Sequence, residues 1–284
     1  MLQPRQHFVR SLSPHGFHRV SYREWGHPAS SRTLVCAHGL TRNGRDFDFL
    51  AAALADRFRV LCPDMPGRGE SEWLRDPNDY VFPTYLTAIT AVLAHADVDQ
   101  VSWVGTSMGG LLGMILAAQP ATPIVRLVVN DIGPAIEPAA LVRIAGYVGL
   151  DPVFDTFKAL EAHVREVSAT FGALTDAQWA ALADSTARQT PDGRWRLNYD
   201  PGIAVPFRSA AAPGSDLWAV WDAIRCPTLV LRGAESDLLS SQTASAMRTR
   251  GPKPRLVEFA AVGHAPMLLI GEQIAPVVAF LDAV

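Results

Sequence analysis

Short apolar runs recur along the chain, and polar residues, glycine or proline bound each of them. The runs with the length and β-branched content of buried strands are 33–37, 57–62, 101–104, 124–130, 227–231 and 255–259. The segments with apolar residues at helical spacing are 46–56, 83–96, 111–118 and 241–250. Because strands alternate with helices, the pattern predicts a mostly parallel sheet with helices on both faces.

The two ends of this alternation differ from its middle. Residues 8–13 and 19–25 flank a Pro-His-Gly turn and predict an opening β-hairpin. After residue 134 the pattern becomes helical at 139–148, 153–170 and 175–186, and a loop rich in turn residues follows before strands resume. We therefore predict a core formed by residues 1–134 and 224–284, with a helical cap inserted at 135–223.

A serine lies between two glycines where the apolar run at 101–104 meets the helical segment at 111–118. The sequence there is Gly-Thr-Ser-Met-Gly-Gly at 105–110. A serine two residues from a glycine on each side, at a strand-to-helix turn, is the nucleophile-elbow pattern, because side chains at the flanking positions would meet neighbouring backbone. Ser107 is thus the candidate nucleophile; the alternative is a glycine-rich turn that merely starts a helix.

A serine hydroxyl needs an adjacent base, which a third group orients. His264 directly follows the last predicted strand and comes after Ser107 in the chain, so it is the candidate base. Two aspartates at strand ends, Asp237 and Asp131, are candidates for the acid. We favour Asp237, because its strand is expected to lie beside the one leading to His264; Glu235 is a weaker alternative.

Two backbone amides are expected to stabilise a developing oxyanion. The Met108 amide lies at the predicted helix N-terminus next to Ser107, and the Leu40 amide follows the His-Gly turn after an early strand. In this arrangement His38 is a structural hydrogen-bonding residue and not a base. Asp64 precedes a Pro-Gly turn, where we expect it to accept hydrogen bonds from backbone amides.

Taken in order, these segments resemble the α/β-hydrolase superfamily over nearly the whole chain. The matching motifs are His-Gly at 38–39, Asp-Met-Pro-Gly-Arg-Gly-Glu-Ser at 64–71, the elbow at 105–110, Arg-Gly at 232–233 with Asp237, and Gly-His at 263–264. The resemblance implies an α/β-hydrolase fold with a mostly parallel eight-stranded sheet and a helical lid inserted after the strand ending near Asp131. It also implies a Ser107–Asp237–His264 triad and an oxyanion hole formed by Leu40 and Met108.

Composition narrows the class of protein further. The 284 residues carry a net charge of −3 without blocks of like charge, so a nucleic-acid partner is not indicated. No apolar run is long enough to span a bilayer, and the N-terminal residues lack the pattern of a signal peptide. The three cysteines lack metal-type spacing, which predicts free thiols and a cytoplasmic location.

We therefore predict a carboxylesterase-like serine hydrolase that acts on a small-molecule ester and needs no metal or organic cofactor. Hydrolysis of a C–C bond next to a ketone, lactone opening and perhydrolysis use the same groups, and a catalytically silent fold that binds ligands is the alternative from another class. Arg42 and Asp131 are tentative substrate-binding residues, with Arg42 a candidate receptor for a substrate carboxylate. Assembly into a homo-oligomer is left open.

Overall fold

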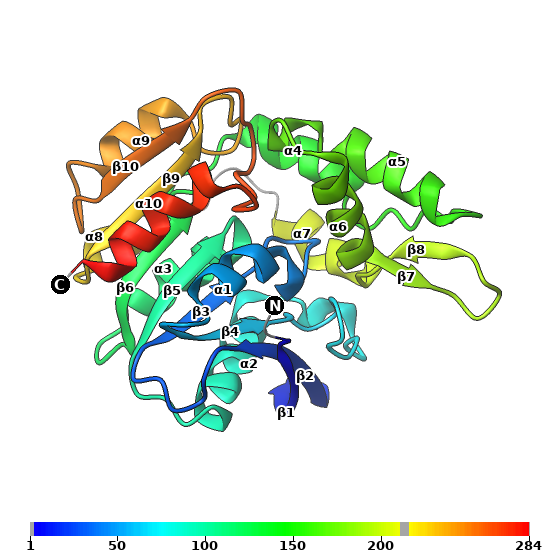
Figure 1. Ribbon diagram of the computed structural model, residues 1–284, viewed down its shortest axis with the longest axis horizontal. Coiled ribbons are helices and arrows are strands. Elements are labelled where there is room, and N and C mark those ends of the chain that lie inside the picture. The colour runs from blue at the N-terminus through cyan, green and yellow to red at the C-terminus, as the bar shows by residue number, and fades with distance from the viewer. Residues whose placement is uncertain (1–2, 211–215, 284) are drawn as a thin grey trace.

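A single mixed sheet runs through the molecule, with helices on both of its faces (Figure 1). The computed structural model describes residues 3–210 and 216–283. The sheet has eight strands in the order β1-β2-β4-β3-β5-β6-β9-β10. These strands are β1 (Arg5–Ser13), β2 (Gly16–Trp25), β3 (Thr33–Ala37), β4 (Arg59–Pro63), β5 (Val101–Thr106), β6 (Ile124–Asn130), β9 (Thr228–Gly233) and β10 (Arg255–Phe259). From β4 to β10 every neighbouring pair is parallel, as the alternation predicts.

The opening hairpin is also confirmed. Strands β1 and β2 pair antiparallel from Arg5 opposite Glu24 to Ser13 opposite Gly16. Gly16 has a φ of +124°, which a residue with a side chain rarely adopts, so glycine suits this turn. β2 then pairs antiparallel with β4 and joins the hairpin to the parallel strands.

Two apolar layers hold the helices against the sheet. Helices α1 (Asp48–Leu54) and α10 (Gly271–Asp282) pack on one face. The other face is covered by α2 (Phe82–His95), α3 (Met108–Ala117), α8 (Trp218–Ala223) and α9 (Ser241–Met247). Successive residues of β5 serve both layers, since Trp103 packs in one and Val104 in the other, both with no exposed surface. This burial on both faces explains why the central strands are continuous apolar runs.

From α4 to α7, the chain between β6 and β9 lies to one side of the sheet, on the right in Figure 1. This stretch contains α4 (Pro138–Tyr147), α5 (Phe157–Val167), α6 (Asp176–Thr186) and α7 (Ala204–Ala210), and α8 follows at its end, on the left of the view. The described residues also form short 3-10 helices: η1 (Gly44–Phe47), η2 (Pro77–Asp79), η3 (Ala169–Phe171) and η4 (Pro201–Ile203). Helix α8 packs against α3, and its Trp221 is fully buried among core side chains. Residues 211–215 of the predicted cap segment lie outside the described part.

One element of this segment differs from the prediction. The loop expected after residue 186 contains a small antiparallel hairpin of β7 (Ala187–Gln189) and β8 (Trp195–Leu197). The Thr190 amide donates to the Arg194 carbonyl at 2.8 Å and closes the turn. Strands this short carry too few residues to show an alternating pattern, so the turn residues between them dominate the sequence signal.

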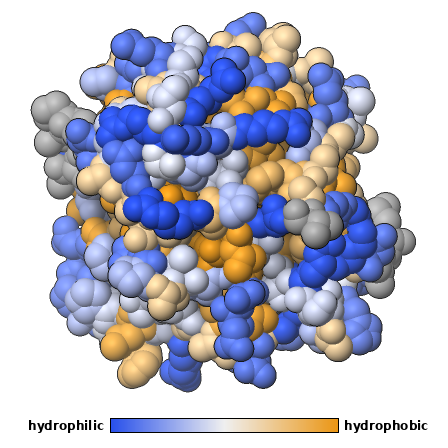
Figure 2. Space-filling view, turned by 90° about the vertical axis from the view of Figure 1, so that its left-hand side faces the viewer, coloured by the Kyte–Doolittle hydropathy of each residue, from blue (hydrophilic) through white to orange (hydrophobic). Residues whose placement is uncertain are grey.

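The surface carries no long apolar stripe on the face shown in Figure 2, where polar and charged side chains divide the hydrophobic surface into separate patches. In the described part of the chain, no helix has both the length and the apolar character needed to cross a membrane.

Candidate active site

Ser107 lies in a strained turn between β5 and α3. Its backbone angles are φ +52° and ψ −117°, a combination that a residue with a side chain adopts only when its surroundings enforce it. A Cβ atom on Gly105 would lie 2.2 Å from the Gly109 carbonyl oxygen, and one on Gly109 would lie 2.0 Å from the Ala37 carbonyl oxygen. The close approach of strand and helix therefore requires both glycines, as the elbow pattern predicts.

Ser107, His264 and Asp131 form a continuous hydrogen-bonded series. Nε2 of His264 lies 3.0 Å from the Ser107 hydroxyl oxygen, and Nδ1 of the same ring lies 2.8 Å from Oδ2 of Asp131. A carboxylate accepts hydrogen bonds, so Nδ1 carries the ring hydrogen and Nε2 is left to accept from the serine. The arrangement has the geometry of a nucleophile, a base and an orienting acid.

The Asp131 carboxylate is completely buried and has several donors. Its Oδ1 accepts from the Gly233 amide at 2.9 Å, and its Oδ2 accepts from the Ser236 hydroxyl at 2.6 Å as well as from His264. Asp131 also has a φ of +56°, in the left-handed region that aspartate tolerates better than most residues. The carboxylate therefore has one well-defined position. The interpretation of Asp131 as a substrate-binding residue is corrected, since its oxygens are engaged inside the protein.

The prediction that Asp237 orients His264 is wrong. Its carboxylate is about half exposed and forms a two-pronged ion pair with Arg143 of α4, at 2.6 and 2.9 Å. β9 does lie next to β10, but Asp237 is four residues beyond Gly233, the end of that strand. Asp131 directly follows Asn130, the last residue of β6, and β6 lies next to the strand that carries Ser107. This offset of one residue from the strand end is the signal that could have identified it.

Further residues that the sequence did not single out hold the catalytic loops together. The Asn130 side-chain amide donates to the Thr106 hydroxyl at 2.9 Å and to the Pro266 carbonyl at 2.7 Å, while the Asn130 backbone carbonyl accepts from the Ser107 amide at 3.0 Å. One buried asparagine thus connects the elbow, the strand before Asp131 and the loop that follows His264.

The loop carrying Leu40 lies beside the elbow. An added Cβ on Gly39 would stand 3.7 Å from the Ser107 Cβ, so the backbone passes close to the hydroxyl. Within residues 3–210 and 216–283, neither the Leu40 nor the Met108 amide donates a hydrogen bond to a protein acceptor. Two amide donors are therefore available on either side of Ser107.

His38 and Asp64 support that loop, as the sequence predicts. Nδ1 of His38 bonds to the Gly39 carbonyl at 2.7 Å, and Nε2 accepts from the Met65 amide at 2.9 Å. Complete burial lowers the pKa of His38 to about 3, so the ring is neutral. Asp64 accepts from the Gly44 amide at 2.7 Å and the Glu70 amide at 3.0 Å, although burial raises its pKa to about 6.

Arg42 does not offer a free cation to a substrate. Its Nε donates to Asp46 at 2.9 Å, and its Nη1 donates to the Thr186 hydroxyl at the end of α6 at 2.7 Å. The guanidinium is therefore neutralised by a core carboxylate and linked to the helical segment. This pairing argues against the expectation that Arg42 receives a substrate carboxylate.

The helical segment also contacts the loop that carries the base. The Thr170 carbonyl accepts from the Gly263 amide at 2.6 Å, and the Thr170 hydroxyl donates to the His264 carbonyl at 3.3 Å. A Cβ on Gly263 would lie 2.8 Å from the Thr170 Cβ, so the two backbones approach closely. The position of His264 thus depends on η3 as well as on the sheet.

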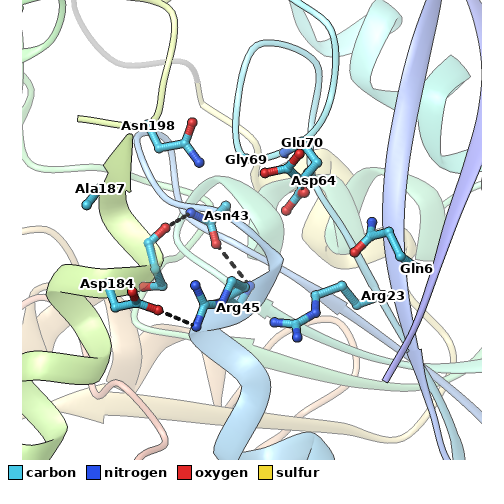
Figure 3. A pocket seen from close by; sticks show the side chains of 11 residues that line it. Gln6, Arg23, Asn43, Arg45, Asp64, Gly69, Glu70, Asp184, Ala187 and Asn198 are labelled. Atoms are coloured by element: carbon cyan, nitrogen blue, oxygen red, sulfur yellow. Dashed lines mark hydrogen bonds and ion pairs between the residues drawn. The ribbon is translucent and has the colours of Figure 1, made fainter. Parts of the chain in front are cut away.

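A polar cavity of about 380 Å³ lies in the seam between the core and the helical segment (Figure 3). Arg45 of η1 reaches across it to Asp184 of α6 at 2.8 Å, and the Asn43 side chain donates to the Ser185 carbonyl at 2.6 Å. Ser107 and His264 do not line this cavity. In the described part of the chain, no group of three or more histidine, cysteine or acidic side chains is arranged to hold a metal ion.

The fold and this site define a member of the α/β hydrolase family, whose family description the chain matches over residues 34–280. The protein is therefore an enzyme of the hydrolase class. It is 48% identical over 280 residues to the 3-hydroxybutyrate-oligomer hydrolase of Cupriavidus necator, which covers 96% of each chain.

Solved structures agree with this assignment. An α/β hydrolase from Novosphingobium aromaticivorans superposes with a TM-score of 0.91 at 38% identity and covers 100% of both chains. The enol-lactonase from Burkholderia xenovorans gives a TM-score of 0.72 at 22% identity, covering 96% of this chain and 100% of its own, and supports the fold alone.

Proposed function

We propose that the protein hydrolyses carboxylic esters through a Ser107–His264–Asp131 triad. The hydrogen-bonded series from the Ser107 hydroxyl through His264 to the buried Asp131 carboxylate carries this proposal. An isolated serine is a weak nucleophile, and a base oriented in this way is what activates it.

The reaction has two halves. In the first, Nε2 of His264 takes the Ser107 proton while the hydroxyl oxygen attacks the ester carbonyl, and the tetrahedral intermediate collapses to an acyl-enzyme as His264 returns the proton to the leaving alcohol. In the second, His264 activates water, which attacks the acyl-enzyme and releases the acid. Asp131 stabilises the imidazolium in both halves by accepting a hydrogen bond from Nδ1–H.

The Leu40 and Met108 amides form the proposed oxyanion hole. Both are unused by the protein in the described part of the chain and lie on either side of Ser107. Hydrogen bonds from these amides strengthen as the carbonyl oxygen of the substrate becomes negative. They therefore stabilise the transition state more than the bound substrate and lower the activation barrier. One such donor is typically worth about 3–4 kcal/mol.

The proposed substrates are short linear oligoesters of hydroxy acids, 3-hydroxybutyrate oligomers above all. The 48% identity to a 3-hydroxybutyrate-oligomer hydrolase over nearly the whole chain supports this choice. Each turnover would cleave one ester bond between a hydroxyl group and a neighbouring acyl unit and leave a shorter chain with a free carboxylate.

Residues 135–223 are proposed to act as the lid that selects these substrates. Polar links such as Arg42 to Thr186 and Arg45 to Asp184 cross part of the seam and separate at lower cost than the apolar contacts that the segment makes elsewhere with the core, so this part of the boundary is the one that opens most easily. The cysteines are unpaired, two of them buried, which supports a reducing compartment such as the cytoplasm.

Turnover of a defined substrate panel tests the function. Purified wild type is given 3-hydroxybutyrate dimer and trimer, p-nitrophenyl butyrate, a butyrolactone and a dienoate ring-cleavage product, and kcat/KM is compared. We expect the oligomers to give the highest value. Ser107→Ala should lose about a thousandfold or more in kcat, the scale of triad loss in serine hydrolases.

Ser102→Ala is the matched control, since Ser102 is a buried serine on β5, the strand that leads to Ser107. It should keep wild-type turnover. Activity that survives in Ser107→Ala would contradict the nucleophile, and higher kcat/KM for the lactone or the dienoate than for every ester would contradict the substrate class.

A further inference from the structure

Arg68 is a fully buried arginine beneath the loop that carries Leu40. It lies in the Pro-Gly-Arg-Gly turn after β4, whose backbone forms a β-bridge with Tyr199 of the helical segment. Its Nη1 donates to the Pro66 carbonyl at 2.7 Å and to the Tyr85 hydroxyl at 2.9 Å. These bonds hold the guanidinium in one orientation.

Among the described residues, no carboxylate contacts the Arg68 guanidinium directly; the Asp200 carboxylate is one side chain away, where it accepts from the Tyr80 hydroxyl. In the part of the chain that the structure describes, its hydrogen-bond acceptors are neutral and it forms no ion pair with a carboxylate. The guanidinium carbon lies 5.0 Å from the ring centre of Tyr85 and 5.6 Å from that of Tyr80, and these cation–π contacts offset only part of the cost of burial. Buried charges in proteins are ordinarily paired, so this exception calls for a reason.

The same side chain contacts both residues of the proposed oxyanion hole. Nε of Arg68 donates to the Leu40 carbonyl at 2.8 Å, and Nη2 lies 4.0 Å from the Met108 sulfur. Leu40 and Met108 come from different elements, the loop after β3 and the start of α3, and the Arg68 side chain links them. The bond to the Leu40 carbonyl also restrains the backbone of the residue whose amide is the proposed donor.

We propose that Arg68 is the positioning residue of the oxyanion hole and that its buried charge favours the oxyanion. In the resting enzyme the guanidinium is bonded directly to neutral groups in the described part of the chain; when the tetrahedral intermediate forms, a negative charge appears on the other side of Leu40 and Met108. Because Arg68 is fully buried, that attraction is screened less than it would be at a surface. The inference rests on the proposed function, since it needs an oxyanion at Ser107.

Kinetics of Arg68→Met and Arg68→Lys test the inference. Three quantities are measured: kcat and KM on the preferred ester, the affinity of a trifluoromethyl ketone that forms a hemiketal oxyanion on Ser107, and the rate of Ser107 phosphonylation by a fluorophosphonate. We expect Arg68→Met to lower kcat about 10–100-fold, a fraction of the loss of a direct donor. Affinity for the ketone and the phosphonylation rate should fall in parallel, with KM within about threefold. Arg68→Lys should recover part of each loss because it keeps the charge.

Arg232→Met is the matched control for burial. Arg232 is also buried and donates Nε–H to a backbone carbonyl, that of Leu239 at 2.7 Å, but it contacts neither Leu40 nor Met108. It should lower the melting temperature as Arg68→Met does and leave kcat near wild type. If kcat and ketone affinity of Arg68→Met stay within about threefold of wild type, or if Arg232→Met loses as much of both, the inference is overturned. A wild type that neither turns over esters nor reacts with the fluorophosphonate would instead overturn the proposed function.

Discussion

Asp131 and His264 lie 133 residues apart in the chain and are joined by a 2.8 Å hydrogen bond between a carboxylate oxygen and Nδ1. The carboxylate is buried at the end of β6 and also accepts from Gly233 and Ser236, so it has little freedom to follow a ring that rotates. The imidazole therefore takes its orientation from the sheet itself. Nε2 remains directed at Ser107.

Substituting the two aspartates separately tests this relationship. Asp131→Asn should lower kcat by about ten thousandfold, as the equivalent change does in serine proteases, because the amide favours the wrong imidazole tautomer. Asp237→Asn should leave kcat near wild type, since it removes only a half-exposed ion pair with Arg143, worth at most about 1 kcal/mol. Steady-state kinetics on one ester distinguish the two, and the opposite ranking would restore Asp237 as the acid.

Arg42 should affect KM through its contact with α6 and not by binding a charged group of the substrate. Because Asp46 neutralises its guanidinium, Arg42→Met should change KM for anionic and neutral esters by the same factor and lower the melting temperature. Thr186→Val removes the link between Arg42 and α6, together with the hydroxyl's bond to the Leu182 carbonyl within the helix, and should reproduce the change in KM with a smaller thermal effect. A selective rise in KM for carboxylate-bearing esters in Arg42→Met would show that the arginine binds the substrate after all.

The elbow glycines should tolerate no side chain. In Gly109→Ala the new Cβ would meet the Ala37 carbonyl oxygen at 2.0 Å, which forces α3 away from β3, so we expect a loss of about 3 kcal/mol or more in unfolding free energy. Gly146→Ala is the control, since its Cβ would meet nothing within 4 Å in α4, and it should gain about 0.5–1 kcal/mol. Urea denaturation measures both, and equal stabilities would refute the steric argument.

His38 should make the protein acid-sensitive. The folded state holds its pKa at about 3, against 6.5 for an ordinary histidine, so below pH 6.5 the unfolded chain binds a proton that the folded one excludes. The contribution of neutral His38 to stability is thus complete above pH 6.5 and is lost as the pH falls, by up to about 1.4 kcal/mol per pH unit. Denaturation midpoints from pH 7 to 4.5 should show wild type losing its advantage over His38→Gln, while exposed His27→Gln runs parallel to wild type.

The predictable part of the molecule is the part encoded by neighbouring residues. Ser107 and His264 follow from short patterns, since a strand, a glycine-flanked turn and a helix are all specified within about ten positions of each other. Asp131 depends on a distance of one or four residues from a strand end and on which strands become neighbours, and the second is not a local property. The sequence offers two carboxylates near strand ends. The shorter offset of Asp131 is a local hint, and the packing of β6 beside β5 decides between them.

The contacts of two arginines near the site could not be predicted from the sequence either. Arg42 and Arg68 both stand in loops near the site, where an arginine is usually solvated. Arg42 is instead tied to Asp46. Arg68 is fully buried and, among the described residues, contacts no carboxylate directly, because the segment around Tyr199 covers its turn. Such tertiary coverage leaves no periodic signature in the sequence.

Thr170 accepts a hydrogen bond from the Gly263 amide and donates one to the His264 carbonyl. These two bonds limit how such enzymes can be re-engineered. Exchanging residues 135–223 between related enzymes is an attractive way to change substrate specificity while the catalytic residues stay the same. In this protein, the donor segment would need a residue that forms hydrogen bonds with the loop containing His264, as Thr170 does. A segment chosen only for the shape of its substrate-binding surface would change the specificity but would also displace His264.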